Sequence, residues 1–284
     1  AFVEERHPLA PLTVHRSTDH GRTWRVQETK ILPDSLGQVP AMHMNERGIT
    51  LLRGPHAGRL IRATRWYGGG NDPAFWPGHC ANAIYNDDGG ETWRTSEPFP
   101  ARGTGEAAIV ELSDGRLHFN SRRHLATDGR DPRRRHVAWS HDGGVTWQDL
   151  AVSEELPDGD QSSDYGLMAG LVRLPMDGCG ILLFSTVDSR GGRRRGSVWA
   201  GFHGGRTWPV KRLVDEGGFA YSSPAVGRSA TRSEGWVYLL YETGGHPDSA
   251  ARLARFNLAW VTEGRDWRGF LPNDSEASAR RAAP

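Results

Sequence analysis

The hydrophobic and polar positions of this chain alternate over short stretches, and such alternation predicts β-strands. Alternating stretches at 107–112 and 116–121 flank a Ser-Asp-Gly turn and predict a hairpin. No window sustains the apolar period of a long amphipathic helix. We therefore expect an all-β core made of many short antiparallel strands.

One short stretch recurs along the chain and divides it into repeats. The copies are STDHGRTW at 17–24, NDDGGETW at 86–93, SHDGGVTW at 140–147 and GFHGGRTW at 201–208. Asp19, Asp88 and Asp142 can each accept backbone N–H bonds in a turn, whereas the fourth copy has His203 at this position. Each interval between copies is long enough for a small antiparallel sheet, and sheets repeated around an axis form a β-propeller.

This pattern, S/T-x-D-x-G-x-T-W, resembles the Asp box of the sialidase (neuraminidase) superfamily. The resemblance implies a six-bladed β-propeller whose boxes lie at hairpins on the rim, away from the central pocket. Residues 25–50 contain no second box, so the chain is one blade short unless the segment 27–39 substitutes for it. We expect one propeller domain over 1–271 and a disordered tail over 272–284.

Composition and charge narrow the classes of function. The 284 residues suit one large all-β domain, and the 36 Gly and 17 Pro suit tight turns. The net charge of +1 gives no reason to expect a nucleic-acid partner, and no apolar run is long enough to span a membrane. Cys80 and Cys179 do not form a disulfide framework, and we expect free thiols. The sequence suggests no metal site, no cofactor and no signal peptide; secreted, periplasmic and cytoplasmic locations are all compatible with it.

The resemblance also implies a chemistry. The anomeric carbon of a sialic acid carries a carboxylate that would repel an Asp or Glu nucleophile, and the family instead uses a Tyr activated by a Glu. Three arginines bind the substrate carboxylate, because a planar guanidinium can make two parallel hydrogen bonds to it. Tyr221 in FAYSSP matches the nucleophile, and Glu106 in GEAAIVEL matches the Glu that activates it.

Two arginines match members of the carboxylate-binding triad. Arg122 in FNSRRH matches the second Arg; it follows Glu106 by sixteen residues across a hairpin, which can place both at one mouth of the propeller. Arg193 in GGRRRG matches the third Arg, with Arg194 or Arg195 in the role under a one-residue slip. Glu242 also matches a family position, where we expect at most an indirect role.

Two family features have no match. An Arg-Ile-Pro strand with the first triad Arg would lie upstream of Ala1, and the loop between Arg6 and Leu12 has no Asp at the place of the general acid. The resemblance implies a retaining exo-α-sialidase whose partner is a sialylated glycan or another acidic sugar. The alternatives are a catalytically impaired propeller that binds acidic glycans, and a glycosidase or lyase of other specificity on the same fold.

Four further segments give local expectations. RDPRRR at 130–135 predicts a solvated loop, and 151–166 an acidic loop. In and beside the turn-rich loop 68–80, Tyr67, Phe75 and Trp76 are expected to be exposed, where they could stack on a sugar ring. ARFNLAWV at 254–261 predicts the closing strand.

Overall fold

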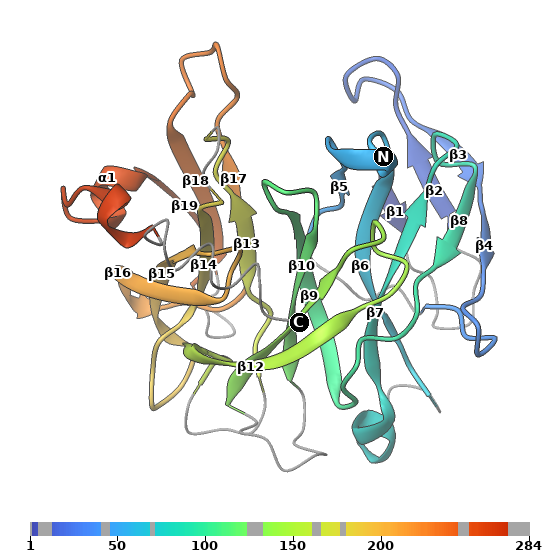
Figure 1. Ribbon diagram of the computed structural model, residues 1–284, viewed down its shortest axis with the longest axis horizontal. Coiled ribbons are helices and arrows are strands. Elements are labelled where there is room, and N and C mark those ends of the chain that lie inside the picture. Colours follow the sequence, from blue (N-terminus) through green and yellow to red (C-terminus); the bar gives the residue numbers. More distant parts are fainter. Residues whose placement is uncertain are drawn as a thin grey trace, which may run out of the picture.

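The computed structural model describes residues 2–4, 13–40, 46–68, 72–123, 133–160, 166–176, 180–243 and 250–271. These residues form five β-sheets (Figure 1). Helix within them is limited to α1 (Leu258–Val261) and three short 3-10 turns, which are η1 (Gly54–His56), η2 (Pro73–Gly78) and η3 (Trp267–Phe270). The expected all-β propeller fold is confirmed.

Four of the sheets follow one another as blades. The first contains β4 (Lys30–Leu32), β5 (Ile49–Thr50), β6 (Leu60–Trp66), β7 (Cys80–Asn86) and β8 (Thr92–Thr95). The second contains β9 (Thr104–Glu111), β10 (Leu117–Arg123), β11 (Arg134–Ser140) and β12 (Gln148–Pro157). The third contains β13 (Gly170–Arg173), β14 (Leu182–Val187), β15 (Arg194–Phe202) and β16 (Thr207–Gly218). The fourth contains β17 (Ser222–Val226), β18 (Trp236–Glu242) and β19 (Ala251–Asn257).

The fifth sheet is formed by β1 (Phe2–Glu4), β2 (Thr13–Arg16) and β3 (Arg25–Glu28). The segment after it adds β4 to the edge of the first blade, where β4 pairs in parallel with β8. Segment 27–39 therefore extends an existing blade and does not build a separate one. The described residues show four blades and this N-terminal sheet, whereas the resemblance implies six blades.

The four boxes lie at hairpins, as expected. They join β2 to β3, β7 to β8, β11 to β12 and β15 to β16. In the third box, Asp142 Oδ1 accepts bonds from the amides of Val145 and Thr146 at 3.0 Å, and Oδ2 accepts the Thr146 hydroxyl at 2.6 Å. The fourth box lacks this carboxylate, and His203 adopts a φ of 57°. The box Asp thus acts on the backbone of its own turn.

The hydrophobic core lies between successive blades. Phe119 on β10 packs on Phe99 and Trp147 between the first two blades, with ring centroids 5.2 and 4.5 Å apart. Phe184 packs near Trp199 and Trp208 in the next layer. Burying such an aromatic side chain contributes on the order of 1.5–3 kcal/mol. These layers fix β9, β13 and β17, the first strands of three blades, which contact one another in the order β9, β13, β17.

Several local expectations are wrong. Of the loop expected at 151–166, residues 151–157 instead continue the ten-residue edge strand β12, most of whose residues are partly or fully exposed; residues 161–165 lie outside the described part. Arg134 and Arg135 begin β11 and do not lie in a solvated loop; residues 130–132 are outside the described part. The closing strand expected at 254–261 is present only over 254–257, in β19, because Leu258–Val261 forms the helix α1. Asn257 caps this helix by accepting a bond from the Trp260 amide at 2.8 Å.

Near the loop 68–80, Phe75 is exposed, but Tyr67 is buried. The Arg65 guanidinium lies 4.0 Å from the centre of the Tyr67 ring, and the His79 ring packs edge-on at 4.8 Å. This ring cannot stack on a ligand because protein groups already contact it. Cys80 is a free, buried thiol as expected, whereas Cys179 and the tail 272–284 lie outside the described residues.

Candidate active site

The predicted nucleophile and the predicted base are in contact. The Tyr221 hydroxyl lies 3.1 Å from Glu106 Oε1 and 3.4 Å from Oε2, within hydrogen-bond reach of both oxygens. Glu106 comes from β9 in the second blade, and Tyr221 directly precedes β17 in the fourth. The two residues are 115 positions apart. The propeller therefore brings together two residues that the sequence links only through the family pattern.

Arg122 completes the contact. Its guanidinium Nη1 donates to Glu106 Oε2 and, at 3.2 Å, to the Tyr221 hydroxyl. The antiparallel pairing of β9 with β10 brings the end of β10 beside the start of β9, as the hairpin predicts. All three side chains meet at one end of the innermost strands.

Aromatic packing fixes the approach to β17. Phe219 is fully buried and stacks on Tyr241 with ring centroids 4.6 Å apart. A Cβ on Gly196 would lie 1.7 Å from the Phe219 ring, so only glycine leaves room for it. Glu242 holds Tyr221 through the backbone, since its amide donates to the Tyr221 carbonyl at 2.9 Å.

Arg193 is the member of the GGRRRG run that reaches the site. Its guanidinium carbon lies 5.6 Å from the centre of the Tyr221 ring. Arg195 instead forms an ion pair with Glu216 at the surface, and Arg194 is exposed at the start of β15. Because Arg193 is itself exposed, its guanidinium can reach a ligand from solvent. The geometry favours Arg193 over its two neighbours for the third position.

A buried ion pair supports the end of β10. Arg135 Nη1 donates to Asp158 Oδ1 at 2.7 Å, and Arg135 Nε donates to the Asn120 side chain at 2.7 Å. Asp158 also accepts a bond from the backbone amide of Arg123, the neighbour of Arg122. Both members of the ion pair are inaccessible to solvent, and removing one partner of such a pair leaves an uncompensated buried charge.

The electrostatic surroundings keep Tyr221 protonated. Burial, followed by the negative charge of Glu106, raises the pKa of the Tyr221 phenol above its usual value, and Arg122 opposes this shift. A phenol in this state is a weak nucleophile until a base removes its proton, and Glu106 is placed to do so. Burial lowers the pKa of nearby Arg65, whose charge interacts with both Glu106 and Arg122.

Sequence reasoning missed Arg65, Arg135 and Asp158. Arg135 lies in a run of charges that reads as a surface loop, and no spacing links it to Asp158. Arg65 lies on β6 between Thr64 and Trp66, and nothing in that spacing marks an Arg as buried. A buried guanidinium is recognised only once its neighbours are known. The expected acid position, the loop between Arg6 and Leu12, lies outside the described residues.

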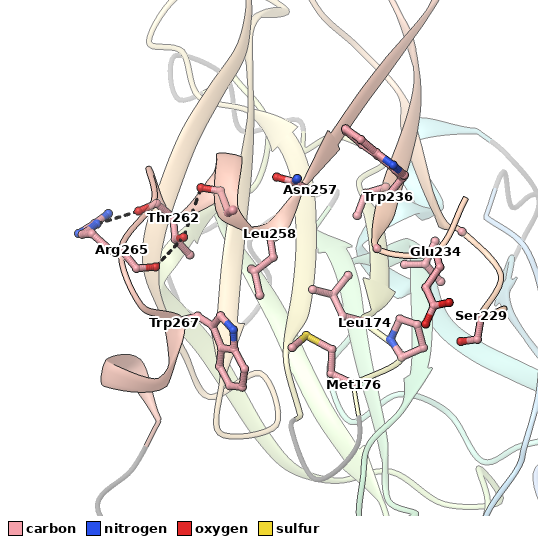
Figure 2. A pocket seen from close by; sticks show the side chains of 16 residues that line it. Leu174, Met176, Ser229, Glu234, Trp236, Asn257, Leu258, Thr262, Arg265 and Trp267 are labelled. Carbon is pink, nitrogen blue, oxygen red and sulfur yellow. Dashed lines mark hydrogen bonds between the residues drawn. The ribbon is translucent and has the colours of Figure 1, made fainter. Parts of the chain in front are cut away.

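A separate cavity lies at the opposite end of β17. It has a volume of about 370 Å³ and is lined mainly by apolar side chains, with Met176, Leu258 and Trp267 among them (Figure 2). Glu234 and Arg265 at this cavity already bond locally, to the Ala230 amide and the Thr262 carbonyl. The cavity does not share residues with the Tyr221 site.

In the described part of the chain, no group of acidic, His or Cys side chains is arranged to hold a metal ion. No helix there is long and apolar enough to cross a membrane. The candidate site consists of the Glu106 carboxylate, the Tyr221 phenol and the guanidinium groups of Arg122 and Arg193.

Comparison with known proteins links this geometry to a family. Residues 7–237 match the family described as the BNR repeat-like domain. A sialidase from Micromonospora viridifaciens is 34% identical over 262 residues, which are 89% of this chain and 37% of that protein. An anhydrosialidase from Macrobdella decora is 31% identical over 254 residues, 84% of this chain and 30% of that protein. The chain thus spans about a third of the length of these relatives.

Solved structures share this propeller fold. The crystal structure of an intramolecular trans-sialidase from Ruminococcus gnavus matches with a TM-score of 0.66 at 22% identity, covering 88% of this chain and 51% of that one. At this identity the likeness concerns the fold.

Proposed function

Because the chain belongs to the BNR-repeat sialidase family, we propose that it is a retaining exo-α-sialidase acting on terminal sialic acids. The observation that carries the proposal is the 3.1 Å contact between the Tyr221 hydroxyl and Glu106. A Tyr with a raised pKa beside a carboxylate fits a reaction in which the nucleophile must be uncharged when the anionic sugar binds.

The proposed reaction has two steps. Glu106 takes the phenol proton while the Tyr221 oxygen bonds to the anomeric carbon and the bond to the leaving group breaks, giving a glycosyl-tyrosine; the departing oxygen takes a proton from solvent. A water molecule then attacks the anomeric carbon and releases a proton to solvent, and the tyrosine oxygen leaves and recovers its proton from Glu106. Retention follows because the sugar is displaced twice at the same carbon.

Arg122 and Arg193 are the proposed carboxylate-binding residues. They flank the Tyr221 ring, Arg122 at its hydroxyl and Arg193 over its face. An Arg193→Ala variant should bind a sialic acid analogue more weakly, because a charge-assisted hydrogen bond contributes roughly 1.5–3 kcal/mol. Arg194→Ala is the matched control, since the neighbouring exposed guanidinium should leave the affinity unchanged. Equal affinities in the two variants would argue against the proposed site.

The experiment that tests the function compares two substrates. A fluorogenic aryl sialoside needs little protonation of its leaving group, whereas sialyllactose needs a general acid, which is typically worth about 10²–10⁴ in rate. Because the family Asp has no match in the sequence, we expect the aryl substrate to be hydrolysed far faster than sialyllactose, with both reactions slow. Tyr221→Phe should abolish both reactions, and Tyr238→Phe on the neighbouring strand should not. Equal, rapid turnover of both substrates would instead show that an acid is present.

Two other outcomes identify the alternatives. Binding of the analogue without turnover of either substrate would favour a propeller that binds acidic glycans. Since the M. decora relative is named an anhydrosialidase, the mass of the released sugar should also be measured by mass spectrometry. A product lighter by one water would mean that a hydroxyl of the sugar itself, and not water, resolves the glycosyl-tyrosine.

A further inference from the structure

Glu46 is a buried carboxyl group that the proposed reaction does not use. Its Oε1 accepts a bond from the Ser223 hydroxyl at 3.0 Å and from the Arg47 amide at 2.9 Å. The backbone amide of Leu171, on β13, faces this carboxyl group and favours its charged form. Its Oε2 is buried and has no hydrogen-bond partner among the residues that the structure describes.

The position of Ser223 connects Glu46 to the proposed nucleophile. Hydrogen bonds from the Ala220 amide to the Glu242 carbonyl and from the Glu242 amide to the Tyr221 carbonyl extend the β17–β18 ladder back to Tyr221. Side chains two residues apart on an extended strand lie on the same face, about 6.6 Å apart. Tyr221 and Ser223 are half-buried on this face, whereas Ser222 and Pro224 are buried on the other, against the third blade.

Glu46 also joins distant parts of the chain. It lies in the segment that leads into β5 of the first blade, and Ser223 belongs to the fourth blade, 177 residues away. Leu171 belongs to the third blade. One carboxyl group therefore joins the segment before the first blade to the fourth blade, two residues from the proposed nucleophile, and faces the third blade.

We propose that Glu46 is a positioning residue that, through Ser223, fixes the beginning of β17 and with it the Tyr221 hydroxyl against Glu106. This inference rests on the proposed function, in which the Tyr221 oxygen is the nucleophile. A rigid strand start holds the phenol at its 3.1 Å distance from the base, and a misplacement of about 1 Å can cost 10²-fold in rate.

The charge of Glu46 gives a distinctive readout. Burial raises its pKa to about 7, and the hydrogen bonds from Arg47 and Ser223 only partly oppose this. Arg47 is the charged neighbour of Glu46 on its own segment. The groups that face the Glu46 carboxyl group from other elements, the Ser223 hydroxyl on β17 and the Leu171 amide on β13, are uncharged. The charged cluster of Glu106 and Arg122 with Tyr221 lies beyond Ser223. Because burial raises the pKa on folding, stability is highest while Glu46 is neutral and is lost as pH rises from about 4.5 to about 7.

Four variants test the proposal. Glu46→Gln keeps an acceptor for Ser223 but cannot ionise, Glu46→Ala removes the link, and Ser223→Ala removes it from the other side. Glu234→Gln, at the far end of the fourth blade, is the control because Glu234 likewise accepts a backbone amide. Relative to Glu46→Gln, we expect the wild-type melting temperature to fall as pH rises from about 4.5 to about 7, and Glu234→Gln to follow the wild type.

Kinetics separate positioning from stability. At pH 6 and below the melting temperature, Glu46→Ala and Ser223→Ala should lower kcat on the aryl sialoside at least about tenfold with little change in KM, and Glu46→Gln should restore most of it. Unchanged kcat in Glu46→Ala, or no recovery of kcat in Glu46→Gln, would overturn the proposal.

A spectroscopic titration keeps the test independent of activity. Subtracting the ultraviolet titration of Tyr221→Phe from that of the wild type isolates the Tyr221 phenol, whose pKa burial and Glu106 hold above its usual value. Glu46→Ala should return this pKa toward its usual value, and Glu234→Gln should not. If the wild type turns over no sialoside, the proposed function fails, but the shift in this titration still decides whether Glu46 positions Tyr221.

Discussion

Gly196 offers a sharp test of how packing places the nucleophile. It lies on β15 and faces the ring of Phe219, which is two residues before Tyr221. A Cβ built on Gly196 would lie 1.7, 2.2 and 2.2 Å from three atoms of that ring, whereas ordinary contacts begin at 3.4 Å. Gly196→Ala therefore forces the Phe219 ring to move by well over 1 Å or the strand to separate from it.

The magnitude follows from the packing around Phe219. The ring is fully buried and stacked on Tyr241, so it has no empty space to enter, and overpacking of this kind costs about 1–3 kcal/mol. For a domain of this size each kcal/mol lowers the melting temperature by roughly 2–4 °C. Because Phe219 and Tyr221 share one short segment, the 3.1 Å contact with Glu106 should also lengthen, and activity should fall about 100-fold.

The assay pairs thermal melting with hydrolysis of the aryl sialoside. Gly191→Ala is the matched control, because Gly191 precedes the same strand and a Cβ there would meet nothing within 4 Å. Activity is compared at a temperature at which both variants are folded. A Gly196→Ala protein as stable and as active as Gly191→Ala would refute the account of how β15 positions Tyr221.

Three further variants test stability. Asp142→Asn should destabilise the protein by about 1–3 kcal/mol in urea unfolding. The amide oxygen can accept the Val145 and Thr146 N–H bonds only without the negative charge, and the amide nitrogen cannot accept the Thr146 hydroxyl. An unfolding free energy unchanged within error would show that the box carboxylate does not stabilise its turn. Asp158→Ala should cost about 3–5 kcal/mol by leaving Arg135 charged and buried, whereas the control Asp114→Ala, in an exposed pair, should cost under about 1 kcal/mol. Burial lowers the pKa of His118 to about 3, so the protein loses stability as pH falls below about 6.5, by about 2 kcal/mol at pH 5. His118→Leu should reduce this loss of stability at acid pH. An unchanged loss would contradict the role given to His118.

The part of the site that could be predicted from sequence is the part that the family pattern carries. Glu106 and Arg122 are joined by one hairpin, so their proximity follows from strand pairing alone. Tyr221 and Arg193 could be placed only by matching them to the family. No sequence pattern predicts that Glu46 is buried, since an isolated Glu beside polar residues is typical of a solvated position. Its burial follows only from the structure, in which Ser223 of the fourth blade donates a hydrogen bond to it.

In the fold, too, the sequence predicts the local features and not the contacts between distant segments. The boxes predict hairpins because the Asp acts on its own turn, and that interaction is local. The parallel pairing of β4 with β8 is not local, and no turn or spacing encodes it. The sequence of β12 predicts a loop because the exposed edge position removes the alternation on which strand prediction depends.

The central claim is that Glu106 activates Tyr221 as a nucleophile, and covalent trapping tests it most directly. A fluorinated sialic acid with a good leaving group should form a glycosyl-enzyme that turns over slowly, and peptide mapping by mass spectrometry should locate the adduct. The account predicts one adduct on Tyr221, none in Tyr221→Phe, and formation slowed about 10²–10⁴-fold in Glu106→Gln. An adduct on a different residue, or equally fast labelling of Tyr221 in Glu106→Gln, would contradict it.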